Sequence, residues 1–125
     1  MKKYIFVVSL LCLLAACTGK RQGEAAAEGA ALPAVEDVVM YQVNPRVFAP
    51  EKSFKAVERR LDSIQTLGIN VVWFMPINEV GQEKSVNSPY CVKDYKGVNP
   101  EFGTLDEFKA LVATCHQKGM NVIID

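Results

Sequence analysis

The feature that most constrains the fold is a junction that occurs twice, where a glycine closes a helical segment and an apolar strand follows at once. Residues 68–73 read Gly-Ile-Asn-Val-Val-Trp, and residues 119–124 read Gly-Met-Asn-Val-Ile-Ile. Neither run alternates between polar and apolar residues, and strands of this kind are usually buried on both faces in parallel sheets. A unit of strand, loop and helix therefore occurs twice. The candidate folds are a doubly wound sheet and a (β/α)8 barrel.

Three strands and two helices are predicted from the residue pattern. The first helix starts at Ser53, whose side chain can cap it, and closes at Gly68. The second starts with the capping box Thr104-Leu105-Asp106-Glu107 and closes at Gly119. The first helix should bury an apolar stripe formed by Phe54, Val57, Leu61, Ile64 and Leu67. The strands are predicted at residues 38–43, 70–76 and 121–125.

Three strands are few for either candidate fold. A barrel of this type needs about 250 residues, whereas the chain has 125. A third strand without a fourth neighbour also leaves apolar edges that an independent soluble domain would cover. We therefore expect a truncated chain that contains only the opening portion of its fold.

The N-terminal segment has the pattern of an export signal. Lys2 and Lys3 precede an apolar block over residues 4–16, which is too short for a membrane span of about 20 residues. The block ends in Leu14-Ala15-Ala16-Cys17, which resembles a bacterial lipobox. A plain secretory signal and a buried core helix are the alternatives.

The lipobox pattern predicts three regions and a location. Residues 1–16 would be the signal peptide, residues 17–36 the lipidated Cys17 and a flexible tether, and residues 37–125 a partial barrel or sheet domain. More than one acyl chain on Cys17 would give stable membrane attachment. We expect a lipid-anchored protein of the bacterial cell envelope, on a periplasmic, outer-membrane or surface face.

The charge balance argues against nucleic acid as a partner. The chain has 14 basic and 14 acidic side chains, and removal of the signal takes away Lys2 and Lys3. The mature chain would therefore be slightly acidic. A protein that binds the phosphate backbone needs a basic surplus, so we expect no nucleic acid.

The connection from Pro76 to Gly103 is the best candidate for a functional segment. It far exceeds the roughly two to six residues of an ordinary strand-to-helix loop. Its aromatic residues and prolines indicate an ordered loop rather than a disordered one. The carboxyl ends of parallel strands line the active face of either fold. The candidates at these positions are Asn44, Arg46, Pro76, Tyr90, Asp94, Tyr95 and Asp125.

Two cysteines remain to be explained after the signal. Cys91 lies in the long loop and Cys115 on the second predicted helix. An exported protein could join them in a disulfide. The alternative is two buried free thiols, and their spacing matches no metal motif.

Several stretches in order resemble the opening of the α-amylase family, glycoside hydrolase family 13. They cover nearly everything after the tether. The matching stretches are Tyr-Gln-Val-Asn-Pro-Arg-Val-Phe at 41–48, the run at 67–76, Pro89-Tyr90 with Asp94-Tyr95 and Phe102-Gly103-Thr104, and the run at 119–125. The resemblance implies an α/β fold that is the N-terminal part of a (β/α)8 TIM barrel, with its first three strands and two helices.

The resemblance also implies roles for individual residues. Tyr90 matches a tyrosine whose ring packs against the sugar at the cleavage site. Asp125 matches an aspartate that hydrogen-bonds beneath the catalytic groups. Asp94 is expected to orient the loop more than to touch sugar, and Tyr95 is expected to pack. The catalytic nucleophile, acid/base and third carboxylate come from later strands in the family, so this chain is expected to contain no catalytic residue.

The leading functional hypothesis is a retaining hydrolase of α-glucosidic bonds in starch-like polysaccharides or malto-oligosaccharides. The alternative is a membrane-tethered glycan-binding barrel without catalysis. No cofactor is predicted in this chain. The segment 48–53 lacks the Asp-x-Asn-x-Asp-Gly pattern that some family members use for calcium, although calcium could bind elsewhere in the full-length protein.

Overall fold

A computed structural model describes residues 29–125. The predicted signal peptide, Cys17 and the first part of the tether lie outside the described residues, so these predictions remain as they stand. Within residues 29–125, no helix has both the length and the apolar character needed to cross a bilayer.

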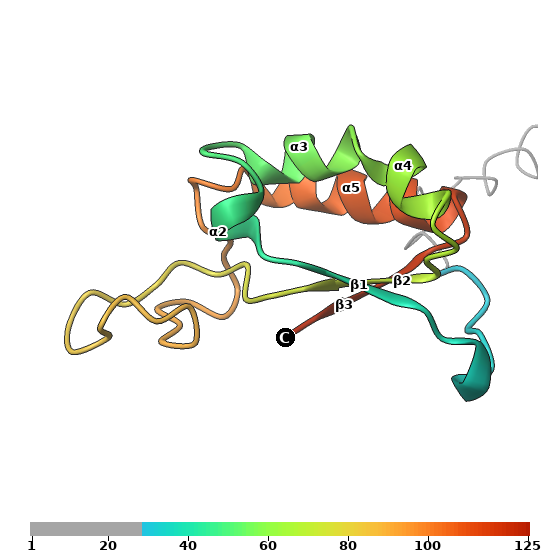
Figure 1. Cartoon of the computed structure of the whole chain (residues 1–125). Helices are drawn as coiled ribbons and strands as arrows, with labels where there is room; N and C mark the ends of the chain where they lie inside the picture. Colours follow the sequence, from blue (N-terminus) through green and yellow to red (C-terminus); the bar gives the residue numbers. More distant parts are fainter. Residues whose placement is uncertain (1–28) are drawn as a thin grey trace, which may run out of the picture.

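The centre of the domain is a parallel sheet whose strands follow one another in chain order (Figure 1). The strands are β1 (Met40–Val43), β2 (Val71–Phe74) and β3 (Asn121–Ile124). Gln42 lies opposite Trp73, which lies opposite Ile123. The three predicted strands and their parallel pairing are therefore confirmed, although β2 and β3 are shorter than the predicted residues 70–76 and 121–125.

The first strand begins two residues later than predicted. The backbone N–H of Val39 donates to the side-chain oxygen of Asn70 at 2.9 Å, and the Asn70 amide donates to the carbonyl of Asp37 at 2.7 Å. Just before β1, the Asn70 side chain therefore makes hydrogen bonds that strand pairing would otherwise supply. The short 3-10 helix η1 (Val35–Asp37) precedes it.

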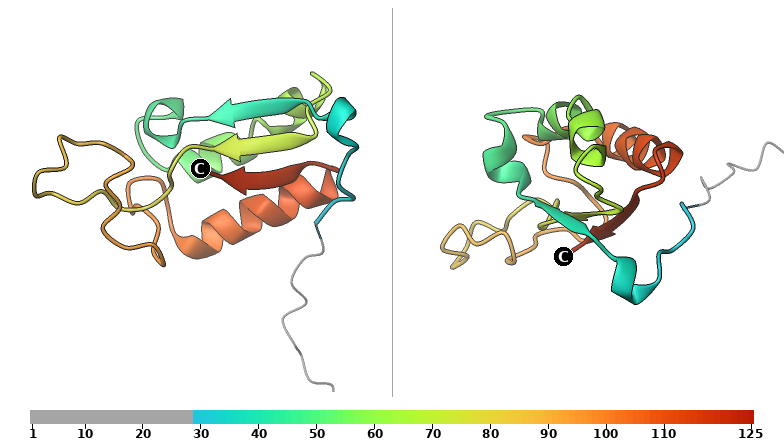
Figure 2. Two further views of the ribbon diagram at one scale, coloured as in Figure 1. Left: turned by 90° about the horizontal axis from the view of Figure 1, so that it is seen from below. Right: turned by 45° about the vertical axis from the view of Figure 1, so that its right-hand side comes forward.

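The helices that follow β1 and β2 pack on the same face of the sheet (Figures 1 and 2). They are α3 (Ser53–Glu58) and α4 (Leu61–Gln65) after β1, and α5 (Leu105–Gln117) after β2. A doubly wound sheet carries helices on both faces, whereas a barrel carries them only outside. The arrangement therefore favours the barrel. The core between the layers contains Val43, Phe54, Val57, Leu61, Val72, Phe74, Phe108 and Leu111.

The first predicted helix is divided and differently capped. Lys52, in the left-handed region with a φ of 51°, takes the capping position, so the prediction that Ser53 caps the helix is wrong. The Ser53 hydroxyl is buried and donates to the carbonyl of Pro45 instead. This contact ties the helix to α2 (Pro45–Phe48), a single turn after β1 that the sequence did not predict.

A tightened turn separates α3 from α4. The N–H of Arg60 donates to the carbonyl three residues earlier, on Val57, at 2.8 Å. The first four residues of the predicted stripe are buried, but Leu67 is 66% exposed, so the stripe is shorter than predicted. Gly68 then closes the segment with a φ of 78°, as expected of a left-handed closing residue.

The second predicted helix forms as expected. Thr104 accepts a hydrogen bond from the Glu107 N–H at 3.1 Å, and the Glu107 carboxylate accepts one from the Thr104 N–H at 2.9 Å. This is the predicted capping box. Gly119 closes the helix with a φ of 76°.

Candidate functional site at the carboxyl ends of the strands

The long loop is ordered, as predicted, but by hydrogen bonds of its backbone and not by burial of its tyrosines, since Tyr90 and Tyr95 are exposed. Val80 and Val92 form an antiparallel bridge, and the N–H of Gly81 donates to the carbonyl of Cys91 at 2.7 Å. Lys93 and Glu79 form an ion pair at 2.8 Å beside this bridge. The loop thus folds as an irregular hairpin that extends beyond the carboxyl ends of the strands (Figure 1).

The base of the loop is held by a side chain that the sequence analysis did not single out. The Asn78 amide donates to the carbonyl of Asp94 at 3.2 Å and to that of Gly97 at 2.7 Å. A lone asparagine two residues after a strand-ending proline gives no sequence signal for this role. Its contacts fix where the second arm of the loop returns to the domain.

Asp94 lies in a turn of the loop. Its carboxylate accepts a hydrogen bond from the N–H of Lys96 at 2.8 Å, which fits the expectation that it orients the loop. Its neighbour Tyr95 was expected to pack, but 82% of its surface is exposed, so that expectation is wrong.

Tyr90 and Asp125 meet at the edge of the sheet, although 35 residues separate them along the chain. The Tyr90 hydroxyl donates to Oδ2 of Asp125 at 2.8 Å. Asp125 follows β3 directly, and its N–H donates to the carbonyl of Phe74 at 2.8 Å. Tyr90 is still 56% exposed, so much of its surface is open to solvent. Two residues that the sequence placed at the active face are therefore in direct contact.

The electrostatics of this pair follow from the contact. The hydrogen bond to Asp125 raises the pKa of the Tyr90 phenol above its usual value, and desolvation and the negative charge of Asp125 act in the same direction. The phenol therefore stays protonated and remains a hydrogen-bond donor at neutral pH. An exposed ring with a fixed polar tip can pack against the apolar face of a sugar.

Arg46 connects the loop to the turn that follows β1. Its guanidinium Nη1 donates to the carbonyl of Asn87 at 2.8 Å. Asn44, the residue directly after β1, accepts a hydrogen bond from the Arg46 N–H at 3.1 Å and so caps α2. Pro76 is buried where the loop leaves β2. Of the residues predicted at the strand ends, Asn44, Arg46 and Pro76 thus support the site's framework.

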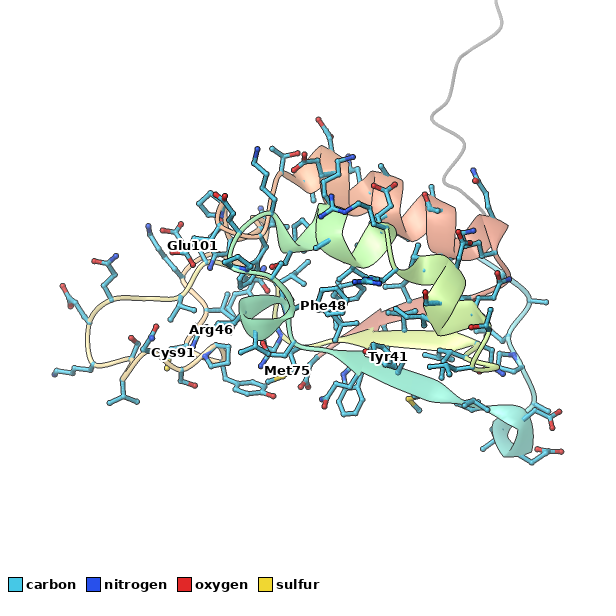
Figure 3. The ribbon with its side chains drawn as sticks, turned by 45° about the horizontal axis from the view of Figure 1, so that its top comes forward. Tyr41, Arg46, Phe48, Met75, Cys91 and Glu101 are labelled. Atoms are coloured by element: carbon cyan, nitrogen blue, oxygen red, sulfur yellow. The ribbon has the colours of Figure 1, made fainter. Side chains whose placement is uncertain are left out.

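A cavity of about 680 Å³ lies between α2 and the loop. Figure 3 shows Arg46 and Glu101, two of its lining residues, on the side of the domain that the loop covers. Neither Tyr90 nor Asp125 lines it. The cavity is mostly polar and contains no aromatic side chain that could stack on a sugar, so the exposed Tyr90–Asp125 pair is the better candidate site.

The two cysteines of the domain do not form a disulfide. Both are free thiols; Cys115 is buried in the core, whereas Cys91 is exposed on the loop. The alternative of two buried thiols is therefore correct for Cys115 only. Burial, followed by the charge of Glu58, raises the pKa of Cys115 to about 12, although Lys118 opposes this shift.

Metal ligands do not gather in the described part of the chain. Residues 29–125 contain no group of three or more histidine, cysteine, aspartate or glutamate side chains placed to hold an ion. Calcium elsewhere in a longer protein stays a prediction.

Comparison with known proteins identifies the domain. Residues 51–125 match the family described as "Alpha amylase, catalytic domain". An oligo-1,6-glucosidase of Halalkalibacterium halodurans is 32% identical over 95 residues, which is 72% of this chain and 16% of that protein. The amino acid transporter heavy chain SLC3A1 of Homo sapiens is 36% identical over 91 residues, or 69% of this chain and 13% of that protein. The chain thus spans about a sixth or less of these relatives.

Solved structures agree in fold. A maltogenic α-amylase, AmyB, from Thermotoga neapolitana superposes with a TM-score of 0.68 at 32% identity, over 73% of this chain and 23% of that one. A trehalose-6-phosphate hydrolase from Bacillus licheniformis superposes with a TM-score of 0.66 at 28% identity, over 75% of this chain and 17% of that one. The three strands and the helices after them are the first part of a (β/α)8 barrel. The chain belongs to the α-amylase family, glycoside hydrolase family 13.

Proposed function

We propose that this chain supplies the first, substrate-facing part of a glycoside hydrolase whose complete barrel cleaves α-glucosidic bonds in malto-oligosaccharides or starch-like polysaccharides. The observation that carries the proposal is the 2.8 Å contact between Tyr90 and Asp125 at the carboxyl edge of the sheet. Active sites of (β/α)8 enzymes lie at this edge. Names of relatives such as oligo-1,6-glucosidase and maltase point to the same class of bond.

The proposed reaction is hydrolysis with retention of configuration. A retaining enzyme needs two carboxyl groups about 5 Å apart, one as nucleophile and one as acid and base. In the proposal these groups belong to segments that are not among the 125 residues. The residues of this chain bind and orient: the Tyr90 ring packs on the sugar, and Asp125 holds the phenol and supports the catalytic groups above it. Asp94 keeps the loop in shape.

One alternative is favoured by a specific observation. The human relative at 36% identity is named as an amino acid transporter heavy chain rather than as a hydrolase. That name supports a non-hydrolytic alternative, which is a membrane-tethered barrel protein that binds glycans without cleaving them. Acidic residues at the ends of later strands would distinguish the two, because the retaining mechanism cannot operate without them.

We also propose that Cys17 is lipidated and anchors the protein in the bacterial cell envelope. The Leu14-Ala15-Ala16-Cys17 pattern supports this proposal. Metabolic labelling with a radioactive fatty acid should mark the protein, and a Cys17→Ser variant should lose the label. Label retained by the variant would contradict lipidation at this residue.

The hydrolase proposal is tested on the complete protein encoded by the intact gene. The reading frame after codon 125 should continue through the remaining strands with three acidic residues at their carboxyl ends. The purified protein should release reducing sugar from maltotriose or soluble starch with retained anomeric configuration by NMR. A continuous frame without those carboxylates, together with an inactive protein, would favour the binding alternative.

A further inference from the structure

The tip of the long loop, residues 82–90, depends on very few contacts for its position. Apart from the buried Ser85, most of its side chains point into solvent, and Val86 is 94% exposed. The cavity of about 680 Å³ lies beneath it, so the tip does not rest on a packed core. No residue of the tip belongs to the hydrophobic core of the described domain, so hydrogen bonds largely set where this segment lies.

Two hydrogen bonds connect the described tip to residues outside the loop. One is the contact of the Tyr90 hydroxyl with Asp125, and the other is the contact of Arg46 with the Asn87 carbonyl, at 2.8 Å each. The other hydrogen bonds of the tip lie within the loop: the N–H groups of Asn87 and Ser88 donate to the hydroxyl and the carbonyl of Ser85, and those of Tyr90 and Cys91 donate to the hydroxyl and the carbonyl of Ser88. Within residues 29–125, Arg46 is thus the one hydrogen-bonding tether from outside the loop besides the candidate site itself.

The turn that Arg46 holds carries backbone strain. Lys84, Val86 and Asn87 have φ angles of 53°, 46° and 59°, in the left-handed region that favours glycine. For a β-branched residue such as Val86 this conformation is a true outlier. Strained residues keep such conformations only where surrounding contacts hold them. Loss of the Arg46 contact should therefore let the turn relax.

Relaxation of the turn would also displace Tyr90. Asn87 and Tyr90 are three residues apart, and the Ser88 side chain and carbonyl link the intervening turn. A charged donor on a carbonyl is among the stronger hydrogen bonds in proteins. We propose that Arg46 is a positioning residue of the sugar-facing site: its bond to the Asn87 carbonyl fixes the turn that delivers Tyr90 to Asp125. This inference rests on the proposed function for its catalytic consequence.

The test compares three variants of the complete protein. Arg46→Met removes the donor but keeps the length of the side chain. Arg46→Lys keeps a donor that can reach a carbonyl. Arg59→Met removes an exposed guanidinium at the carboxyl end of α3 and serves as the matched control. Each is measured for kcat/KM on maltotriose, for melting temperature and for the titration of Tyr90, identified by comparison with Tyr90→Phe.

Arg46→Met should lower kcat/KM by about threefold to tenfold, the change that one net hydrogen bond represents. The pKa of Tyr90 should fall toward its usual value, because the phenol no longer reaches Asp125. Arg46→Lys should keep part of the wild-type kcat/KM and part of the raised Tyr90 pKa, and Arg59→Met should change neither quantity. A lower melting temperature with unchanged kcat/KM and unchanged Tyr90 titration would overturn the positioning role and leave Arg46 as a structural residue.

The two proposals fail in different ways. If the wild-type protein hydrolyses no α-glucoside, the proposed function fails, but the Tyr90 titration still tests the tether. If the wild type is active and Arg46→Met matches it in both readouts, the tether proposal fails alone.

Discussion

At the residue scale, Tyr90 combines two possible roles that a single substitution cannot separate. Its ring can pack on sugar, and its hydroxyl donates to Asp125 at 2.8 Å. In the complete enzyme, Tyr90→Phe removes only the hydroxyl and should lower kcat/KM by about threefold to tenfold. Tyr90→Ala removes the ring as well and should lower kcat/KM by about a hundredfold, because the sugar loses its orientation. Steady-state kinetics on maltotriose measures both.

Tyr95 is the matched control for this pair, since it is also an exposed tyrosine of the loop. Tyr95→Ala should leave kcat/KM close to that of the wild type. If Tyr90→Ala were equally silent, the stacking role of Tyr90 would be wrong. If Tyr90→Phe and Tyr90→Ala were equally damaging, the hydroxyl rather than the ring would carry the effect.

Cys115 and Cys91 allow a second prediction at this scale. Burial raises the pKa of Cys115 from the usual 9.0 to about 12, whereas Cys91 is exposed. At pH 8 only about one Cys115 thiol in ten thousand would be ionised, and the thiolate is the form that reacts. Iodoacetamide at pH 8, followed by peptide mass spectrometry, should label Cys91 and leave Cys115 unlabelled until the protein is denatured.

The raised pKa of Cys115 also determines how the stability of the folded state changes with pH. The folded state keeps a proton that the unfolded state loses above pH 9.0. The contribution to stability is therefore complete below pH 9 and is lost as the pH rises toward 12. Equal labelling of the two cysteines in the native protein would show that Cys115 is not held in the core.

At the scale of elements, the start of α5 joins the loop to the core through Gly103. This residue has a φ of 136°, and a Cβ atom there would lie 2.6 Å from the Glu107 carboxylate and 2.9 Å from the Phe54 ring. Gly103→Ala should therefore disturb both the capping box and the core. It should lower the free energy of unfolding by about 2 kcal/mol or more. The melting temperature of the protein measures the loss.

Gly68→Ala is the matched control for the steric part of this effect. Gly68 also has a left-handed φ, of 78°, but a Cβ atom there would meet nothing within 4 Å. Gly68→Ala should lower the free energy of unfolding by only about 1 kcal/mol, because only the backbone conformation is unfavourable for alanine. An equal loss in the two variants would mean that the contacts of Gly103 with Glu107 and Phe54 are unimportant.

Elements governed by local patterns could be predicted from the sequence. The capping box of α5, the closing glycines and the apolar runs of β2 and β3 depend on neighbours in the chain, and all formed as expected. The division between α3 and α4, the capping of α3 by Lys52 and the turn α2 depend on contacts with distant segments. The buried Ser53 hydroxyl bonds to Pro45 and not to its own helix, which periodicity cannot reveal.

The candidate site likewise combines features that the local sequence predicts with features that depend on distant contacts. The positions of Asp125 directly after β3 and of Tyr90 in the loop after β2 followed from the pattern and the family resemblance. Their contact, and the supporting roles of Asn78 and Arg46, arise from a loop whose path no short-range rule specifies. The expected packing of Tyr95 failed for this reason, because aromatic character predicts burial only when the backbone turns the ring inward.

At the scale of the whole molecule, one face of the sheet carries no helix in the described residues (Figure 2). Side chains alternate along strands, so Val43, Val72 and Phe74 point to the helices and are buried. Gln42, Trp73 and Ile123 share the opposite face by their register. In a closed barrel that face is the interior, filled by side chains from the other strands.

Residues 18–125 produced alone should not behave as a stable monomeric domain. Met40, Ile123 and Ile124 are 52%, 43% and 48% exposed, and within residues 29–125 β1 and β3 each leave one edge of the sheet unpaired. Exposed strand edges and apolar faces promote association between copies. The segment should therefore elute as aggregates in size-exclusion chromatography, and it should release no reducing sugar from starch, since it lacks the proposed carboxylate pair. Mixing it with the remaining part of the barrel, expressed separately, should reduce aggregation by covering the same face. A monomeric segment that hydrolyses starch would contradict both the incomplete core and the proposed location of catalysis.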